Sequence, residues 1–278
     1  MIPKDIHYVW IGPYMDSQPY PQLWKNVLTD YNIVQWNNVT AKPYIDQAVN
    51  LFGGIDKLKD KSYTYLSDLV RLLILKDHGG VYLDHDIHVI KDFTELLIDM
   101  KLVLTYQYDN PNKEKLLSYT KGKLLNDLLN GEYGTYNRVS ATVNNCFIAV
   151  IKNHEFISKA IDLTLLNHYS PKDGQYAMSD WGVGPEVFTL LANINGFQTN
   201  SCLTETINNI RILEKKYLHP LHGLTRYKHG NEVFDLHKEN VLKDDTTFAI
   251  HMHEHFGVQM FLDKRSKPIQ EWYNELNS

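Results

Sequence analysis

The fold of this chain is decided by residues 62–90, which read SYTYLSDLVRLLILKDHGGVYLDHDIHVI. The first half is predicted to be a helix, because its apolar side chains recur at helical spacing at Leu66, Leu69, Val70 and Leu73. Two glycines at 79–80 end this helix. Residues 81–90 are rich in apolar and β-branched side chains and predict a strand that breaks near two aspartates. A helix followed at once by a buried strand is typical of an α/β sheet.

The same alternation of helix and strand patterns continues on both sides of this segment. Further strands are predicted over 6–12, 32–36, 101–107, 143–151, 210–213 and 247–251. Further helices are predicted over 19–31, 40–51, 153–168 and 185–194. Between 109 and 136 the pattern loosens into Asn, Lys, Gly and Tyr, which indicates an insertion or lid-like segment. No linker composition separates two domains, so one α/β domain is expected.

Composition excludes several classes of protein. The 278 residues carry 28 Lys and Arg against 33 Asp and Glu, a net charge of −5, whereas nucleic-acid binding usually needs a strong basic excess. The two cysteines, Cys146 and Cys202, form no disulfide framework, which favours a reducing cytoplasm. No signal peptide is visible at the N-terminus, and no apolar stretch approaches the ~20 residues needed to span a bilayer. Peripheral contact with a membrane stays open.

The central chemical feature is the pair Asp84 and Asp86 at the end of the predicted strand. On an extended backbone these two residues point to the same side and His85 points away. Two adjacent carboxylates repel each other unless a cation or hydrogen-bond donors compensate, and Mg²⁺ or Mn²⁺ suits such oxygens. An isolated Asp-x-Asp is more often a solvated turn. Here it follows an apolar strand, and acidic residues at strand ends of α/β sheets lie where ligands usually bind.

Other side chains could extend this site. Asp68 and Arg71 share a face of the apolar helix, so an ion pair near the sheet is expected rather than an exposed one. Trp10, at the end of the first strand, could stack on a planar base or simply fill the core. Seven of the 13 histidines lie in residues 219–278, and three of them alternate at His251, His253 and His255. On a strand these three would share one face, either as a polar edge or as metal ligands.

Several of these motifs together resemble one family. The opening 2–12, IPKDIHYVWIG, the stretch 67–71, SDLVR, and the stretch 79–86, GGVYLDHD, resemble glycosyltransferase family 32, which includes mannosyltransferases and bacterial capsule enzymes. The glucosylating domains of the large clostridial toxins share the same stretches. The resemblance covers about residues 1–107, with weaker echoes at Asn145, at 184–185 and at 249–251.

The resemblance implies a GT-A fold, a Rossmann-like mixed central sheet flanked by helices, with a helical or loop insertion on the acceptor side. Residues 1–107 would form the nucleotide-sugar-binding core. Residues 108–140 would form the insertion or lid. Residues 141–278 would form the acceptor side and close the metal site. The expected enzyme is a retaining, metal-dependent hexosyltransferase of surface polysaccharide synthesis, such as that of a bacterial capsule. Its donor would be a UDP-sugar by preference or GDP-mannose, and its acceptor a glycan or lipid-linked oligosaccharide.

The resemblance also implies roles for individual residues. Val9, Trp10 and Tyr82 would line the nucleotide pocket, with Trp10 stacked on the base. Asp68, Arg71 and Asn145 would contact the donor sugar, and Asp84 would contact the ribose or the sugar. Gly184 and Pro185 would line the acceptor side. Asp86 would be a ligand of Mn²⁺ or Mg²⁺, together with His251 or His253. The serine and tryptophan that usually follow the family's histidine are absent here, where 256–259 reads FGVQ. The expected location is the cytoplasm, including the inner face of the membrane.

Two other functions fit parts of the sequence. A phosphohydrolase of the haloacid dehalogenase kind also carries Asp-x-Asp at a strand end, and Asp244-Asp245 could act as its later acidic motif. However, the threonine often seen after that motif is not present next to Ile87. A non-catalytic sugar-binding module would use Trp10 and the 18 tyrosines without needing a metal site. Transfer to a sugar acceptor, phosphate release from simple esters and metal-independent binding distinguish the three hypotheses.

Overall fold

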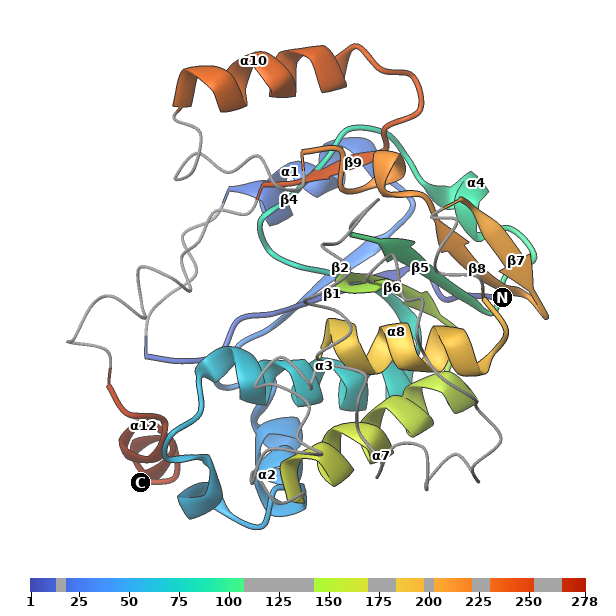
Figure 1. Ribbon diagram of the computed structural model, residues 1–278. Coiled ribbons are helices and arrows are strands. Elements are labelled where there is room, and N and C mark those ends of the chain that lie inside the picture. The colour runs from blue at the N-terminus through green and yellow to red at the C-terminus, as the bar shows by residue number, and fades with distance from the viewer. Residues whose placement is uncertain (14–18, 108–142, 170–183, 198–202, 222–230, 253–266) are drawn as a thin grey trace.

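A computed structural model describes residues 1–13, 19–107, 143–169, 184–197, 203–221, 231–252 and 267–278. Their centre is a seven-stranded sheet in the order β2-β1-β3-β6-β5-β8-β7 (Figure 1). The strands are β1 (Asp5–Val9), β2 (Asn32–Trp36), β3 (Gly80–Leu83), β5 (Leu102–Tyr106), β6 (Val143–Val150), β7 (Glu205–Ile207) and β8 (Ile210–Leu213). A separate two-stranded sheet pairs β4 (Ile87–Val89) with β9 (Ala249–His251).

The large sheet is mixed. Strand β1 pairs in parallel with β2 and β3, and β5 pairs in parallel with β8. Strand β6 runs antiparallel to both β3 and β5, and β7 runs antiparallel to β8. The parallel strands are joined through helices α1 (Tyr20–Val27), α2 (Lys42–Leu51) and α3 (Tyr63–His78), which is the Rossmann-like connection that was predicted. The predicted α/β class with a mixed central sheet is therefore confirmed.

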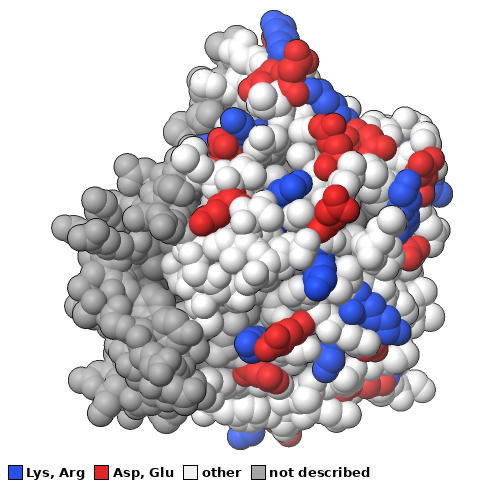
Figure 2. Space-filling view, turned by 90° about the vertical axis from the view of Figure 1, so that its right-hand side faces the viewer, with Lys and Arg blue, Asp and Glu red and all other residues white. Residues whose placement is uncertain are grey.

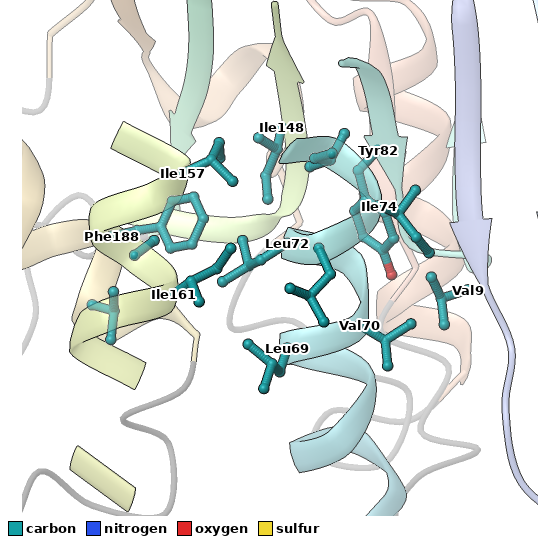
Figure 3. Close-up of a cluster of buried hydrophobic side chains, with 14 of the residues drawn as sticks. Val9, Leu69, Val70, Leu72, Ile74, Tyr82, Ile148, Ile157, Ile161 and Phe188 are labelled. Carbon is teal, nitrogen blue, oxygen red and sulfur yellow. The ribbon is translucent and has the colours of Figure 1, made fainter. Parts of the chain in front are cut away.

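One face of the sheet is covered by α2, α3, α7 (Glu155–Tyr169) and α8 (Pro185–Ile194) (Figure 1). Helix α3 begins at Ser62, whose side chain accepts a hydrogen bond from the Tyr65 backbone N–H at 3.2 Å. Its buried residues, among them Leu69 and Leu72, belong to one apolar cluster with Ile148 of β6, Ile157 of α7 and Phe188 of α8 (Figure 3). This helix lies under the centre of the sheet and places Asp68 and Arg71 near the end of β3.

Gly79 and Gly80 form the corner between α3 and β3. Gly79 has a φ of +68° and Gly80 a φ of +94°, values that side chains with a Cβ rarely adopt. A Cβ on Gly80 would lie 2.5 Å from the backbone oxygen of Asp5 and 2.9 Å from Nε2 of His7. Glycine is thus required here both by the backbone conformation and by the close approach of β1, and the corner fixes where β3 begins.

The opposite face of the sheet has its own core, in which α1, α4 (Thr94–Leu97) and the β4–β9 pair pack against the large sheet. Trp24 of α1 is fully buried in this core. Helix α10 (Asn231–Leu242) lies beyond β9, and α12 (Ile269–Leu276) lies beside the short helix η1 (Ile55–Leu58) (Figure 1). A second short helix, η2, spans Lys215–Tyr217.

Most of the predicted elements are confirmed, several with the same bounds. The prediction for 32–36 and 210–213 is identical to β2 and β8, and the helix at 185–194 is α8. The helix predicted over 19–31 is shorter, because α1 ends at Val27. Strand β7 and helices α4, α10 and α12 were not predicted. The predicted insertion at 108–140 lies outside the described residues, and the division into functional segments stays a prediction.

The surface of the described residues carries charges of both signs. On the face shown in Figure 2, Lys and Arg side chains lie next to Asp and Glu side chains over much of the visible surface. Within the described ranges, no helix combines the length and the apolar character needed to cross a membrane.

Candidate functional site: an acidic turn, an arginine hub and a histidine

The two aspartates lie in a turn between β3 and β4. Strand β3 ends at Leu83, the backbone N–H of Asp84 donates to the Cys146 carbonyl at 2.9 Å, and that of Ile87 donates back to Asp84 at 3.1 Å. The expectation that Asp84 and Asp86 share one side of an extended strand is therefore wrong, because the chain turns at His85 and Asp86. The carboxylates nevertheless come together, since a histidine on the neighbouring strand faces both.

That histidine is His251, the last residue of β9 and the register partner of Ile87. Its Nε2 lies 3.2 Å from Oδ1 of Asp86 and 3.9 Å from Oδ2 of Asp84. One ligand atom from each of the three residues lies within 4.8 Å of the others. Asp86 is 7% exposed, and the side chain of Asp84 is 24% exposed, so the group opens toward solvent at Asp84.

Electrostatics hold His251 close to the carboxylates. Burial lowers the pKa of His251 more than any other single influence, but Asp86 and Cys146 together outweigh burial and hold that pKa well above its ordinary value. His251 and Asp86 are also side chains that a cation would ligate. Cation binding therefore competes with the proton on His251, as is usual for histidine ligands.

Arg71 on α3 connects the acidic turn to the rest of the site. Its Nη2 lies 2.8 Å from Oδ1 of Asp68, and its Nη1 lies 3.2 Å from Oδ1 of Asp84 and donates to the Asn145 carbonyl at 2.8 Å. The guanidinium also lies 4.4 Å from the centroid of the Tyr82 ring. Arg71 is 5% exposed and Asp68 is 8% exposed, so the buried ion pair predicted from the helix is observed together with the further partners that such a pair needs.

Tyr82 and Asn145 orient the two carboxylates that Arg71 binds. The Tyr82 hydroxyl donates to Oδ1 of Asp84 at 2.9 Å, and Tyr82 itself is buried in the core beside Ile74 (Figure 3). The Asn145 side-chain amide donates to Oδ1 of Asp68 at 2.9 Å. Burial raises the pKa of Asp68 to about 6, opposed by Arg71, so this carboxyl is ionised at neutral pH.

Gly184 closes the site from α8, whose first residue is Pro185. A Cβ at position 184 would lie 2.7 Å from Nδ2 of Asn145 and 3.3 Å from Oδ2 of Asp68. Only a glycine lets the start of α8 approach these two polar groups so closely. Gly184 was predicted on the acceptor side, and the structure brings it against Asp68 and Asn145.

Trp10 lies immediately after β1 and beside the acidic turn. Its ring centroid is 4.5 Å from that of His85 in an edge-to-face arrangement, and Trp10 itself is half-buried. Val9, the preceding residue, is 6% exposed. The ring of His85 thus packs against Trp10 next to the two aspartates. The other two histidines of the predicted cluster, His253 and His255, lie outside the described residues.

Charge balance indicates what this site can bind. Among the described residues, the site combines the carboxylates of Asp68 and Asp84, which contact the guanidinium of Arg71, with the carboxylate of Asp86, which contacts His251. With His251 neutral, the group carries a net charge of −2, which equals the charge that a divalent cation brings. Oxygen ligands with one imidazole suit Mn²⁺ or Mg²⁺ that also shares phosphate oxygens with a substrate.

Two residues of this region were missed by the sequence reasoning. Sγ of Cys146 lies 3.2 Å from Nε2 of His219, and both side chains are 1% exposed. Cys146 follows Asn145 directly, so its nearness to the site could have been inferred from the strand alone. His219 follows η2 and carries no motif, and only the tertiary structure reveals its position.

Part of the chain matches a known family. Residues 16–103, about a third of the chain, match the profile of the family described as "Glycosyltransferase sugar-binding region containing DXD motif". The matched segment contains Asp68, Arg71, Tyr82, Asp84 and Asp86. The prediction of a glycosyltransferase with a DXD motif is confirmed at this level.

One curated relative and several solved structures are also similar. The chain is 26% identical to "Toxin Afp18" of Yersinia ruckeri over 147 residues, which is 53% of this chain but only 5% of the toxin. PaToxG glycosyltransferase is 21% identical, with 69% of each chain covered and a TM-score of 0.45. The UDP-bound glycosyltransferase domain of the YGT toxin is 13% identical, with 77% of this chain and 80% of that domain covered and a TM-score of 0.40. Mouse xyloside xylosyltransferase 1 is 10% identical, with 89% and 83% covered and a TM-score of 0.40.

Proposed function

We propose that the protein is a metal-dependent glycosyltransferase that moves a hexose from a nucleotide-sugar, preferably a UDP-sugar, to a hydroxyl group. The observation that carries this proposal is that Asp84, Asp86 and His251 lie together, with Asp84 also bound by the buried Arg71. A sugar-binding module would not need three buried or half-buried carboxylates at one point.

The donor set fits a divalent cation. Asp86 and His251 would hold Mn²⁺ or Mg²⁺, with His253 as a further candidate ligand. Asp84 would either ligate the same ion or bind the ribose of the donor. The bound ion would supply positive charge where negative charge grows on the departing diphosphate. Arg71 keeps Asp84 in place through its 3.2 Å contact, and Tyr82 does so through its hydroxyl.

The chain's own residues would orient the donor. Trp10 and Val9 would line the nucleotide pocket, with the base stacked on the Trp10 ring. Asp68, Arg71 and Asn145 would hold the hydroxyl groups of the sugar, and Gly184 and Pro185 would border the acceptor. Oδ1 of Asp68 already accepts from both Arg71 and Asn145, which suits a positioning role better than nucleophilic attack.

Retention of the anomeric configuration would then follow from attack on the same face that the leaving group departs from. The bond between the sugar anomeric carbon and the diphosphate oxygen breaks as the acceptor oxygen bonds to that carbon. The acceptor proton passes to the departing diphosphate. Isolation of a covalent glycosyl-enzyme adduct by mass spectrometry would contradict this part of the proposal.

The acceptor and the biological setting are also proposals. A glycan or lipid-linked oligosaccharide of surface polysaccharide synthesis is one candidate, with the enzyme in the cytoplasm or at the inner face of the membrane. The similarity to Toxin Afp18 over 147 residues favours a second candidate, the transferase part of a toxin that modifies a host macromolecule. Transfer of a radiolabelled sugar to bacterial lipid extracts or to eukaryotic cell lysate separates the two.

The site assignment is tested with a panel of nucleotide-sugars. UDP-glucose, UDP-galactose, UDP-N-acetylglucosamine and GDP-mannose are each incubated with Mn²⁺, and release of the nucleoside diphosphate is measured. We expect Asp86→Asn to lower turnover at least about 100-fold, because the ion that would compensate the diphosphate charge loses one of its ligands. Asp30→Asn is the matched control, since Asp30 makes an exposed ion pair with Lys4 away from the site. Full metal-dependent turnover in Asp86→Asn would refute the assignment.

A further inference from the structure

A second group of metal-binding side chains lies directly behind the acidic turn. It consists of Cys146 on β6, His219 after η2, and His251 on β9, and one ligand atom of each lies within 4.8 Å of the others. Sγ of Cys146 and Nε2 of His219 are only 3.2 Å apart. The rings of His219 and His251 lie 5.5 Å apart. Cys146 and His219 are each 1% exposed and the His251 side chain is 11% exposed, as is expected of ligands and not of a solvated surface.

The chemistry of this group differs from that of the acidic turn. A thiolate and two imidazoles are the ligands that Zn²⁺ and Co²⁺ prefer, and they are poor ligands for Mg²⁺ and Mn²⁺. The acidic turn offers two carboxylates and one imidazole, which suit the harder ions. His251 belongs to both groups, and its ring therefore lies between a hard site and a softer one.

We propose that Cys146, His219 and His251 form a second metal site, selective for Zn²⁺ and similar ions, which competes with the acidic turn for His251. The role of His251 at the acidic turn rests on the proposed transferase function, whereas the Zn²⁺ site itself does not. When the ion binds, the Cys146 thiol and any protonated imidazole release their protons to solvent. An aspartate of the turn or a water molecule supplies the fourth ligand of a tetrahedral site.

Binding of Zn²⁺ at this site would inhibit the proposed transferase reaction. The ligand atoms already lie close together, so only small side-chain movements are needed to close around an ion. Asp84 is the more exposed of the two aspartates, and an ion from solvent would enter past it. Once His251 is taken by Zn²⁺, the acidic turn loses its imidazole ligand. Zinc inhibition that excess Mn²⁺ relieves is the expected behaviour.

The site is tested first by binding alone. Co²⁺ is titrated into the purified full chain without any nucleotide-sugar, and the thiolate-to-cobalt charge-transfer absorption in the near ultraviolet is recorded. We expect one equivalent of Co²⁺ to produce this band in the wild type and in the control variant Cys202→Ser, which retains Cys146. Cys146→Ser and His219→Asn should lose it. Far-ultraviolet circular dichroism establishes that each variant is folded.

Competition is tested next. Nucleotide-sugar hydrolysis supported by Mn²⁺ is measured over a series of Zn²⁺ concentrations, and each variant is compared with its own rate without Zn²⁺. Loss of one ligand should raise the inhibitory Zn²⁺ concentration at least about tenfold in Cys146→Ser. Absence of the cobalt band in the wild type, or its persistence in a folded Cys146→Ser variant, would refute the site. Unchanged sensitivity of Cys146→Ser to Zn²⁺ would refute it as well. If the protein hydrolyses no nucleotide-sugar, the proposed function fails while the cobalt band still decides the site.

Discussion

At the scale of single residues, His7 is held as a neutral imidazole by two hydrogen bonds of opposite sense. Trp36 donates its indole N–H to Nδ1 of His7 at 3.1 Å, so the ring proton must lie on Nε2, which donates to the Gly79 carbonyl at 3.1 Å. His7 is 2% exposed. Burial, with a smaller contribution from His78, lowers the pKa of His7 to about 4. The histidine of the motif at 6–12 thus ties β1 to the corner from which β3 starts.

A pH dependence of stability follows. Because the pKa of His7 is lower in the folded protein than in the unfolded chain, its neutral form stabilises the fold above about pH 6.5, and this contribution is lost as the pH falls toward 4. At 1.36 kcal/mol per pKa unit, the loss between pH 7 and pH 4.5 is about 2–3 kcal/mol. In His7→Gln, the difference between the free energies of unfolding at these two pH values should shrink by that amount.

The measurement is urea unfolding of both proteins at pH 7 and pH 4.5. The comparison between variants is needed because Asp68, whose pKa is raised to about 6, acts in the opposite direction over part of this range. His237→Gln on the exposed side of α10 serves as control and should leave the difference unchanged. Equal pH dependence in His7→Gln and the wild type would show that His7 does not titrate as described.

At the scale of elements, helix α1 supports the acidic turn through one side chain. Trp24 is fully buried, and its indole N–H donates to the carbonyl of Ile87 at 2.7 Å. Ile87 is the first residue of β4 and directly follows Asp86, while its partner across the strand pair is His251. The ring of Tyr8 meets Trp24 edge to face at 5.6 Å, which links the helix to β1 as well.

Removal of the indole N–H should therefore loosen the fold. Trp24→Phe loses a buried hydrogen bond and leaves part of the indole volume empty, and we expect it to lower the free energy of unfolding by about 2–3 kcal/mol. Urea unfolding at neutral pH provides the measurement. Leu23→Ala, on the same helix but 44% exposed, should change the stability by less than about 0.5 kcal/mol. Similar losses in the two variants would argue against a special role for Trp24.

At the scale of the whole molecule, the site is assembled from elements that are far apart in the chain. Helix α3 supplies Asp68 and Arg71, the β3–β4 turn supplies the two aspartates, β6 supplies Asn145, and β9 supplies His251. A ligand that contacts several of these elements binds only the folded protein. Ligand binding should therefore stabilise the whole domain against unfolding.

Mn²⁺ together with UDP should raise the melting temperature. At a ligand concentration of 100 times Kd the gain is about 2.7 kcal/mol, which corresponds to about 5–10 °C for a domain of this size. Thermal unfolding with and without both ligands measures the shift, and EDTA should reverse the part that depends on the metal. Asp86→Asn should show no metal-dependent shift. A shift of equal size in that variant would place the ion elsewhere.

The sequence alone determined the elements whose signal is local. Helix α3 and strands β2, β6 and β8 were predictable, because a periodic apolar face or a continuous apolar run needs no knowledge of distant residues. Strand β7, with three residues, is too short to show a pattern, and its ends are set by pairing with β8. The motif residues Asp68, Arg71, Asp84 and Asp86 were also visible in the sequence.

Only the tertiary structure decided how these residues meet. The turn at His85 replaced the expected extended strand, and the pairing of β4 with β9 placed His251 at both aspartates, although 165 residues separate Asp86 from His251. The same pairing placed His251 beside Cys146 and His219, which no spacing along the chain connects. Side-chain type and local periodicity are written in the sequence. The distance between ligand atoms depends on strand register and on the packing of separate elements, which only the folded chain fixes.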